Sequence, residues 1–67
     1  MKRTPVVSTN VNSIGYANGV IEVEFNDGSI YQYFGVDEYV FKSFLEAPSK
    51  GRFVHYHLKG YQYLKVA

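Results

Sequence analysis

The stretch Ser13-Ile-Gly-Tyr-Ala-Asn-Gly-Val-Ile-Glu-Val-Glu-Phe25 decides the fold. Apolar and polar residues alternate on both sides of Asn18-Gly19, the dipeptide that best fits a two-residue type I′ turn. This turn places Glu22 and Glu24 on one face of the hairpin and the large apolar residues on the other. We therefore predict a β-hairpin whose core face carries Ile14, Tyr16, Ile21, Val23 and Phe25.

The next turn, Asn26-Asp27-Gly28, allows two registers. A two-residue loop would place Gln32 on the core face, where an unpaired amide costs about 1–3 kcal/mol. A three-residue loop with Gly28 in the left-handed conformation places Tyr31 and Tyr33 there instead. We favour the second register, which gives both tyrosines a core role with hydroxyls at the rim. The alternative is that the two rings form an exposed platform on which nucleobases stack.

The two ends of the chain predict further short strands. Pro5 precedes Val6 and Val7, a pattern typical of a short leading strand or extended arm, and residues 8–12 form a polar connection. Residues 61–66 alternate again and predict a last strand.

Helical spacing separates the hairpins from the last strand. Asp37 suits the N-cap of a first helix, which Pro48 ends at Ala47 or earlier. Ser49 suits the N-cap of a second helix that runs to about Leu58. The apolar stripe that should lie on the sheet is Val40, Phe41, Phe44 and Leu45.

This order of elements predicts a small α+β domain, an antiparallel β-meander sheet with two short helices packed on one face and a C-terminal strand. A chain of 67 residues leaves room for a single domain, residues 1–67. It contains no cysteine, which excludes disulfides and thiolate metal sites. Seven tyrosines and five phenylalanines must therefore supply much of the cohesion.

Two motifs carry a family resemblance. One is Gly28-Ser-Ile-Tyr-Gln-Tyr-Phe-Gly-Val36, followed by a short acidic helix, and the other is Ala47-Pro-Ser-Lys-Gly-Arg-Phe53. Together they make residues 6–66 resemble the KTSC domain family, which is named after the C-terminus of some lysyl-tRNA synthetases and includes stand-alone small bacterial proteins. Asp37 departs from the pattern, since proline is common at that position.

The resemblance implies a fold more sharply than a function. The family has no established activity, and the occurrence of the domain in lysyl-tRNA synthetases implies RNA binding. Its most specific positions here are Tyr31 and Tyr33 of the Tyr-x-Tyr centre and Ser49 and Gly51 of the Ser-x-Gly turn.

Charge is unevenly distributed along the chain. The net charge is only +1, which lacks the basic excess typical of nucleic-acid-binding proteins. Residues 22–46 hold all six acids, whereas residues 47–67 hold four cations and no acid. This asymmetry either makes one face attractive to anions or serves only solubility.

The segment Ser49-Lys50-Gly51-Arg52 breaks the usual rules for a helix start. Cations in the first turn oppose the helix dipole, and glycine lowers helix propensity. Free N–H groups, a glycine and two cations together describe a seat for phosphate or carboxylate. Alternatively, Lys50 and Arg52 are solvated and Ser49 only caps the helix.

Aromatic and basic residues interleave in the C-terminal tail. Tyr61 and Tyr63 alternate with Lys59 and Lys65 in a pattern that fits single-stranded nucleic acid. The same pattern also protects an edge strand from pairing with other chains.

The two histidines do not predict a metal site. On a helix, His55 and His57 point to nearly opposite sides, and no cysteine can complete a site. His57 falls within the apolar arc and is expected to be packed, while His55 lies on the polar side. No spacing pairs a nucleophile with a base, so we expect no catalysis and no cofactor.

We therefore expect a small non-catalytic binding module that contacts RNA, such as tRNA, or another nucleic acid through a basic C-terminal surface. The alternative is a protein-interaction module that uses the face of Glu22 and Glu24 or the exposed helix. Residues 1–5 contain no apolar signal segment, so we expect a bacterial cytoplasmic location. No apolar run approaches the length of a membrane span, so we expect no membrane partner, and we also expect a monomer. The candidate surface consists of Ser49, Lys50, Gly51, Arg52, His55, Lys59, Tyr61, Tyr63 and Lys65.

Overall fold

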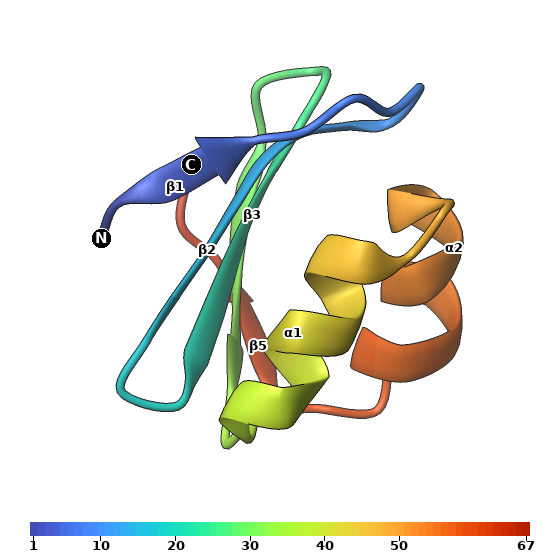
Figure 1. Ribbon diagram of the computed structural model, residues 1–67. Coiled ribbons are helices and arrows are strands. Elements are labelled where there is room, and N and C mark those ends of the chain that lie inside the picture. Colours follow the sequence, from blue (N-terminus) through green and yellow to red (C-terminus); the bar gives the residue numbers. More distant parts are fainter.

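A five-stranded antiparallel sheet in the order β1-β2-β3-β4-β5 forms one layer of the computed structural model, which describes residues 1–67. The helical segments cover one face of this sheet (Figure 1). This confirms the predicted α+β meander. The strands are β1 (Arg3–Pro5), β2 (Val11–Ala17), β3 (Val20–Phe25), β4 (Ile30–Phe34) and β5 (Tyr63–Lys65). The helices are α1 (Glu38–Glu46), α2 (Lys50–Phe53) and the π-helix η1 (Val54–Leu58).

Both hairpin turns have the predicted geometry. Asn18 and Gly19 take φ values of 51° and 78°, as a type I′ turn requires, and Ala17 pairs with Val20. Gly28 takes a φ of 89° at the end of a three-residue loop. The three-residue register is confirmed, because Tyr31 pairs with Val23 and Tyr33 with Ile21.

The predicted leading strand was misplaced. The strand that pairs with β2 is Arg3–Pro5, and Val7 is fully exposed. Pro5 fits an edge strand because its missing N–H can face solvent. The β1–β2 ladder ends at Pro5, opposite Ser13, and one further hydrogen bond joins the Val6 N–H to the Asn12 carbonyl at 3.0 Å. Here the β2–β3 ladder shifts register between Val11 and Ser13.

The helices begin and end close to the residues that the sequence predicted. Helix α1 ends at Glu46, before Pro48, and the Ser49 hydroxyl accepts a hydrogen bond from the Arg52 N–H at 3.3 Å. Asp37 occupies the N-cap of α1, but its side chain makes no capping hydrogen bond. The second helix reaches Leu58 as predicted, although its second half is a π-helix. None of these helical segments has the length and apolar run needed to cross a bilayer.

Aromatic stacking joins the helices to the core. The buried Phe44 ring of α1 stacks on Phe53 of α2 at a centroid distance of 4.8 Å. Tyr16 stacks on Phe41 at 5.4 Å, and its hydroxyl donates to the Val36 carbonyl at 2.7 Å. The buried core consists of Val11, Ile14, Ile21, Val23, Tyr33, Val36, Phe44, Phe53 and Leu58.

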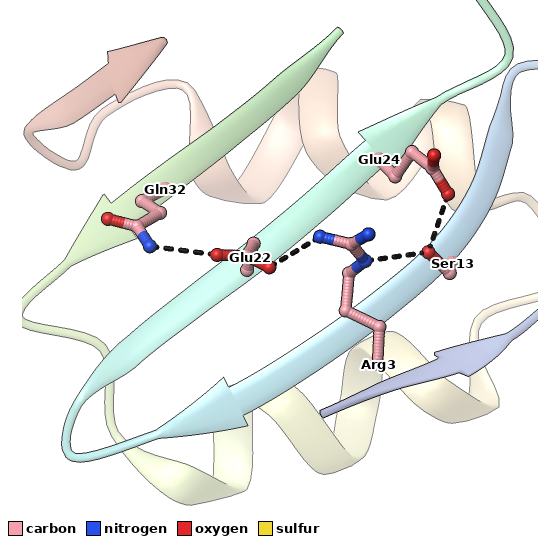
Figure 2. Close-up of polar contacts among 5 residues, drawn as sticks. All are labelled: Arg3, Ser13, Glu22, Glu24 and Gln32. Atoms are coloured by element: carbon pink, nitrogen blue, oxygen red, sulfur yellow. Dashed lines mark hydrogen bonds and ion pairs between the residues drawn. The ribbon is translucent and has the colours of Figure 1, made fainter. Parts of the chain in front are cut away.

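The other face of the sheet carries a chain of polar contacts instead of a helix layer (Figure 2). Arg3 donates to the Glu22 carboxylate and, through Nε, to the Ser13 hydroxyl at 3.0 Å. Gln32 donates to Glu22 at 2.8 Å, and Ser13 donates to Glu24 at 3.0 Å. Glu22 and Glu24 lie on the face opposite the core, as the alternation predicted, but Glu22 is only 8% exposed.

Gly15 makes room for β1 beside this polar chain. A Cβ at Gly15 would lie 2.6 Å from the Lys2 carbonyl oxygen and 3.1 Å from Arg3 Cγ. Because the first of these atoms belongs to the backbone, a side chain at this position would push β1 away from β2.

We expect Gly15→Ala to lower the free energy of unfolding by about 1–3 kcal/mol, because the clash with the Lys2 carbonyl cannot relax by a rotamer change. Urea denaturation measures this difference. Gly60→Ala is the matched control, because a Cβ there meets nothing within 4 Å. Equal effects of the two variants would show that β1 moves freely.

The pKa of Glu22 lies below its ordinary value, chiefly because the Gln32 amide donates a hydrogen bond and also because Arg3 is nearby. A lowered folded-state pKa adds stability above the unfolded value of about 4.3, and this stability is lost as the pH falls through the folded value.

We therefore expect Glu22→Gln to destabilise the protein most near neutral pH and progressively less below about pH 4. Urea titrations of both proteins across this range measure the difference. Glu46→Gln removes the same charge from an exposed position at the end of α1 and is the control. A stability difference between the native protein and Glu22→Gln that does not change with pH would contradict the argument.

Candidate functional site

An open cleft of about 550 Å³ lies between the sheet and the helical segment of residues 50–58. Its floor consists of the rings of Phe25, Tyr31 and Tyr33, and Gly51 and Val54 line it from the helical segment. Polar residues of two loops complete its rim. A cleft of this volume, which combines aromatic rings with polar groups, is a candidate ligand site.

The two rim loops are bonded to each other. The Asn26 N–H donates to the Asn10 carbonyl at 2.9 Å, and the Asn26 amide donates to the Thr9 carbonyl at 2.6 Å. Asp27 accepts hydrogen bonds from the Ser29 hydroxyl and N–H at 2.7 and 2.9 Å. The Ser29 hydroxyl is the main reason that the pKa of Asp27 is lowered, so this rim carries a carboxylate at neutral pH.

Three tyrosines meet beside the cleft. Tyr63 of β5 lies against Tyr31 and Tyr33 of β4, with ring centroids 6.0 and 5.9 Å away. Burial raises the pKa of Tyr33, which is 6% exposed, so its hydroxyl remains a donor. Tyr63 is 59% exposed, and Lys65 pairs in register with Tyr31. The strands therefore hold one open aromatic ring next to a cation.

The segment Ser49-Lys50-Gly51-Arg52 has structural partners. Lys50 Nζ donates to the Ala47 and Leu45 carbonyls at 2.5 and 3.1 Å, so it caps the C-terminal end of α1. A Cβ at Gly51 would lie 2.6 Å from the Asn10 amide nitrogen. The glycine therefore gives room to Asn10, and the lysine complements the dipole of the preceding helix.

The predicted anion seat contains two cations, Lys50 and Arg52. Because Lys50 is bonded to α1, Arg52 is the only one of the two whose side chain makes no hydrogen bond or ion pair within the chain. Arg52, His55 and Lys59 are exposed on the helical segment. Tyr63 and Lys65 are exposed on β5 and adjoin the tyrosines of β4. Tyr61 differs from the prediction, since it is half-buried and packs against the core.

The prediction of a packed His57 was wrong. His57 is exposed, and one face of its ring lies against Phe53 at a centroid distance of 4.6 Å. The π-helix changes the helical spacing from the one that the prediction assumed. The structure brings together no group of three or more side chains that could hold a metal ion.

The rim residues of the cleft were missed by sequence reasoning. They are Thr9, Asn10, Asn26, Asp27 and Ser29. They belong to two polar connections far apart in the sequence, which an up-and-down meander places at the same end of the sheet. The predicted topology could have identified them, because it places these two loops at the same end of the sheet.

Comparison with known proteins identifies the family. The model of the KTSC domain family matches residues 7–63, most of the chain. The chain belongs to the KTSC domain family. The crystal structure of a KTSC domain protein from Yersinia pestis superposes on this KTSC domain with a TM-score of 0.93 at 39% identity, covering 98% of this chain and 97% of that one. An uncharacterized protein of Stutzerimonas stutzeri (strain A1501) is 41% identical over 54 residues, covering 78% of this chain and 76% of its own.

We expect Lys50→Met to lower the free energy of unfolding by about 1 kcal/mol, because the two carbonyls at the end of α1 lose their charged donor. Thermal denaturation measures the loss. Lys59→Met is the matched control, since the Lys59 side chain is exposed and bonded to no other residue. If the two variants were equally stable, Lys50 would contribute nothing as a cap.

Proposed function

We propose that this KTSC domain is a non-catalytic module that binds single-stranded nucleic acid, chiefly RNA. In this proposal one base stacks on Tyr63 at the mouth of the cleft, and its phosphate lies against Lys65. The observation that carries the proposal is the exposed Tyr63 ring, which is held in place by Tyr31 and Tyr33. We expect the domain to act as a monomer in the cytoplasm.

The tyrosine contacts favour stacking because they orient the ring before a ligand arrives. A side chain that is already positioned loses less conformational entropy on binding. Tyr31 is itself fixed by Phe25, whose ring meets it edge-on at 5.6 Å. Stacking on such a ring contributes about 1–3 kcal/mol per base with little sequence preference.

Charge determines where the phosphates can lie. Lys65 follows Tyr63 by two residues and shares its face of β5, so a base on the ring brings its phosphate toward the ammonium group. The Asp27 carboxylate at the cleft rim would repel phosphate, but it can accept hydrogen bonds from a base amino group. With a net charge of only +1, the affinity should be modest and should fall as salt rises.

The alternative, a protein partner on the face of Glu22 and Glu24, has less support. Arg3 and Gln32 occupy both oxygens of Glu22, and Ser13 donates to Glu24. A partner that used these carboxylates would have to break the chain of contacts that joins β1 to the sheet.

We expect Tyr63→Ala to weaken binding of a fluorescent single-stranded RNA by about 5- to 100-fold, because the stacking energy is lost. Fluorescence anisotropy at about 50 and 200 mM salt measures the affinity and its salt dependence. Tyr39→Ala is the matched control, since Tyr39 is 69% exposed but lies on α1. The proposal fails if the native protein binds no RNA at the lower salt, or if the two variants bind alike.

A further inference from the structure

A second hollow, of about 200 Å³, lies where the chain passes from α1 to α2. Arg52, Phe53, Tyr56 and His57 line it from the helical segment, and Ala47, Pro48 and Ser49 line it from the junction. No residue lines both this hollow and the cleft. The two concavities therefore occupy different sides of residues 50–58.

Arg52 and His57 share one hollow although they lie five residues apart, in α2 and η1. In a regular α-helix, residues five apart differ by about 140° around the axis, since each residue turns the chain by about 100°. Between Arg52 in α2 and His57 in η1 the chain changes from the α to the π pattern, whose wider turn reduces this angle. Such π-turns are rare and are frequently found at functional sites.

The side chains around this hollow have unused hydrogen-bond donors. Arg52, Tyr56 and His57 make no side-chain hydrogen bond or ion pair within the chain, and the Ser49 hydroxyl, which accepts from the Arg52 N–H, keeps its own O–H donor. The His57 ring is oriented by Phe53, which is itself stacked on the buried Phe44. Glu46, which directly precedes Ala47 of the lining, is the acid nearest in sequence, and it forms no ion pair with these side chains. The hollow thus combines a fixed imidazole with a free guanidinium.

We propose that this hollow holds a phosphate group of the bound strand, with the Arg52 guanidinium and a His57 ring N–H donating to its oxygens. A guanidinium binds phosphate through two parallel N–H donors, and an imidazole offers at least one N–H whether neutral or charged. Tyr56 adds a hydroxyl at the edge. This inference rests on the proposed function, since it names where a second part of the same strand binds.

Two histidines of the same helical segment provide a matched test. His57 lines the hollow, whereas His55 is exposed outside it, against Tyr56. We expect His57→Ala and Arg52→Gln each to weaken RNA binding several-fold, and Arg52→Gln to reduce the slope of log affinity against log salt by about one. His55, although part of the surface that the sequence predicted, lines neither concavity and has no contact with the strand in this proposal. His55→Ala should therefore leave the affinity nearly unchanged. Each variant alters an exposed side chain, and its thermal denaturation confirms that it is folded.

Inorganic phosphate supplies a second measurement that does not depend on RNA. Titration should shift the NMR signals of the His57 ring and the Arg52 side chain saturably, and those of the His55 ring much less. If RNA binds but His57→Ala, His55→Ala and Arg52→Gln all match the native protein, the inference is overturned while the proposed function stands. If RNA does not bind, selective shifts at His57 and Arg52 still support the phosphate site, and equal or absent shifts overturn it.

Discussion

The register of the β2–β3 hairpin is the constraint on which the rest of this structure depends. Two consecutive residues with positive φ, Asn18 and Gly19, set that register. A slip of one residue would turn Ile14, Ile21 and Val23 toward solvent and remove the surface on which the helices pack. The second turn carries the same register into β4, where it directs Tyr31 and Tyr33 toward the helices. The aromatic floor of the cleft follows from these two turns.

The junction between α1 and α2 shows how residues that are locally unfavourable can be satisfied by their neighbours. Lys50 opposes the dipole of α2 but caps the carbonyls at the end of α1. Gly51 weakens a short helix but allows Asn10 to approach its backbone. The same junction leaves the Arg52 side chain without a partner, and His57 lines the same hollow. Structural residues and candidate binding residues thus alternate along one short segment.

The aromatic residues also divide into structural residues and candidate binding residues. Tyr33, Phe44 and Phe53 are buried and hold the helices on the sheet. Tyr63 and Tyr56 are exposed, and each stands beside one of the two concavities. A small cysteine-free domain needs most of its rings for cohesion, so rings that remain exposed and oriented are good candidates for ligand contacts. In the two proposals, Tyr63 of β5, beside the cleft, takes a base, and the hollow on the other side of the helical segment takes a phosphate.

The sequence by itself determined the Asn18-Gly19 turn with the β2–β3 register, the end of α1 before Pro48 and the Ser49 cap, because neighbouring residues decide each of these. It allowed two registers for β4, and the structure has the favoured one. It also carried the family resemblance in the Tyr-x-Tyr and Ser-x-Gly motifs. Only the tertiary structure decided the burial of Glu22 under Arg3, the contact of Asn10 with Gly51, the packing of Tyr61 and the meeting of the two rim loops. These features join residues that are distant in sequence, and their partners depend on how β1 and the helices pack on the sheet. The exposure of His57 follows from a π-helix that periodicity alone did not predict.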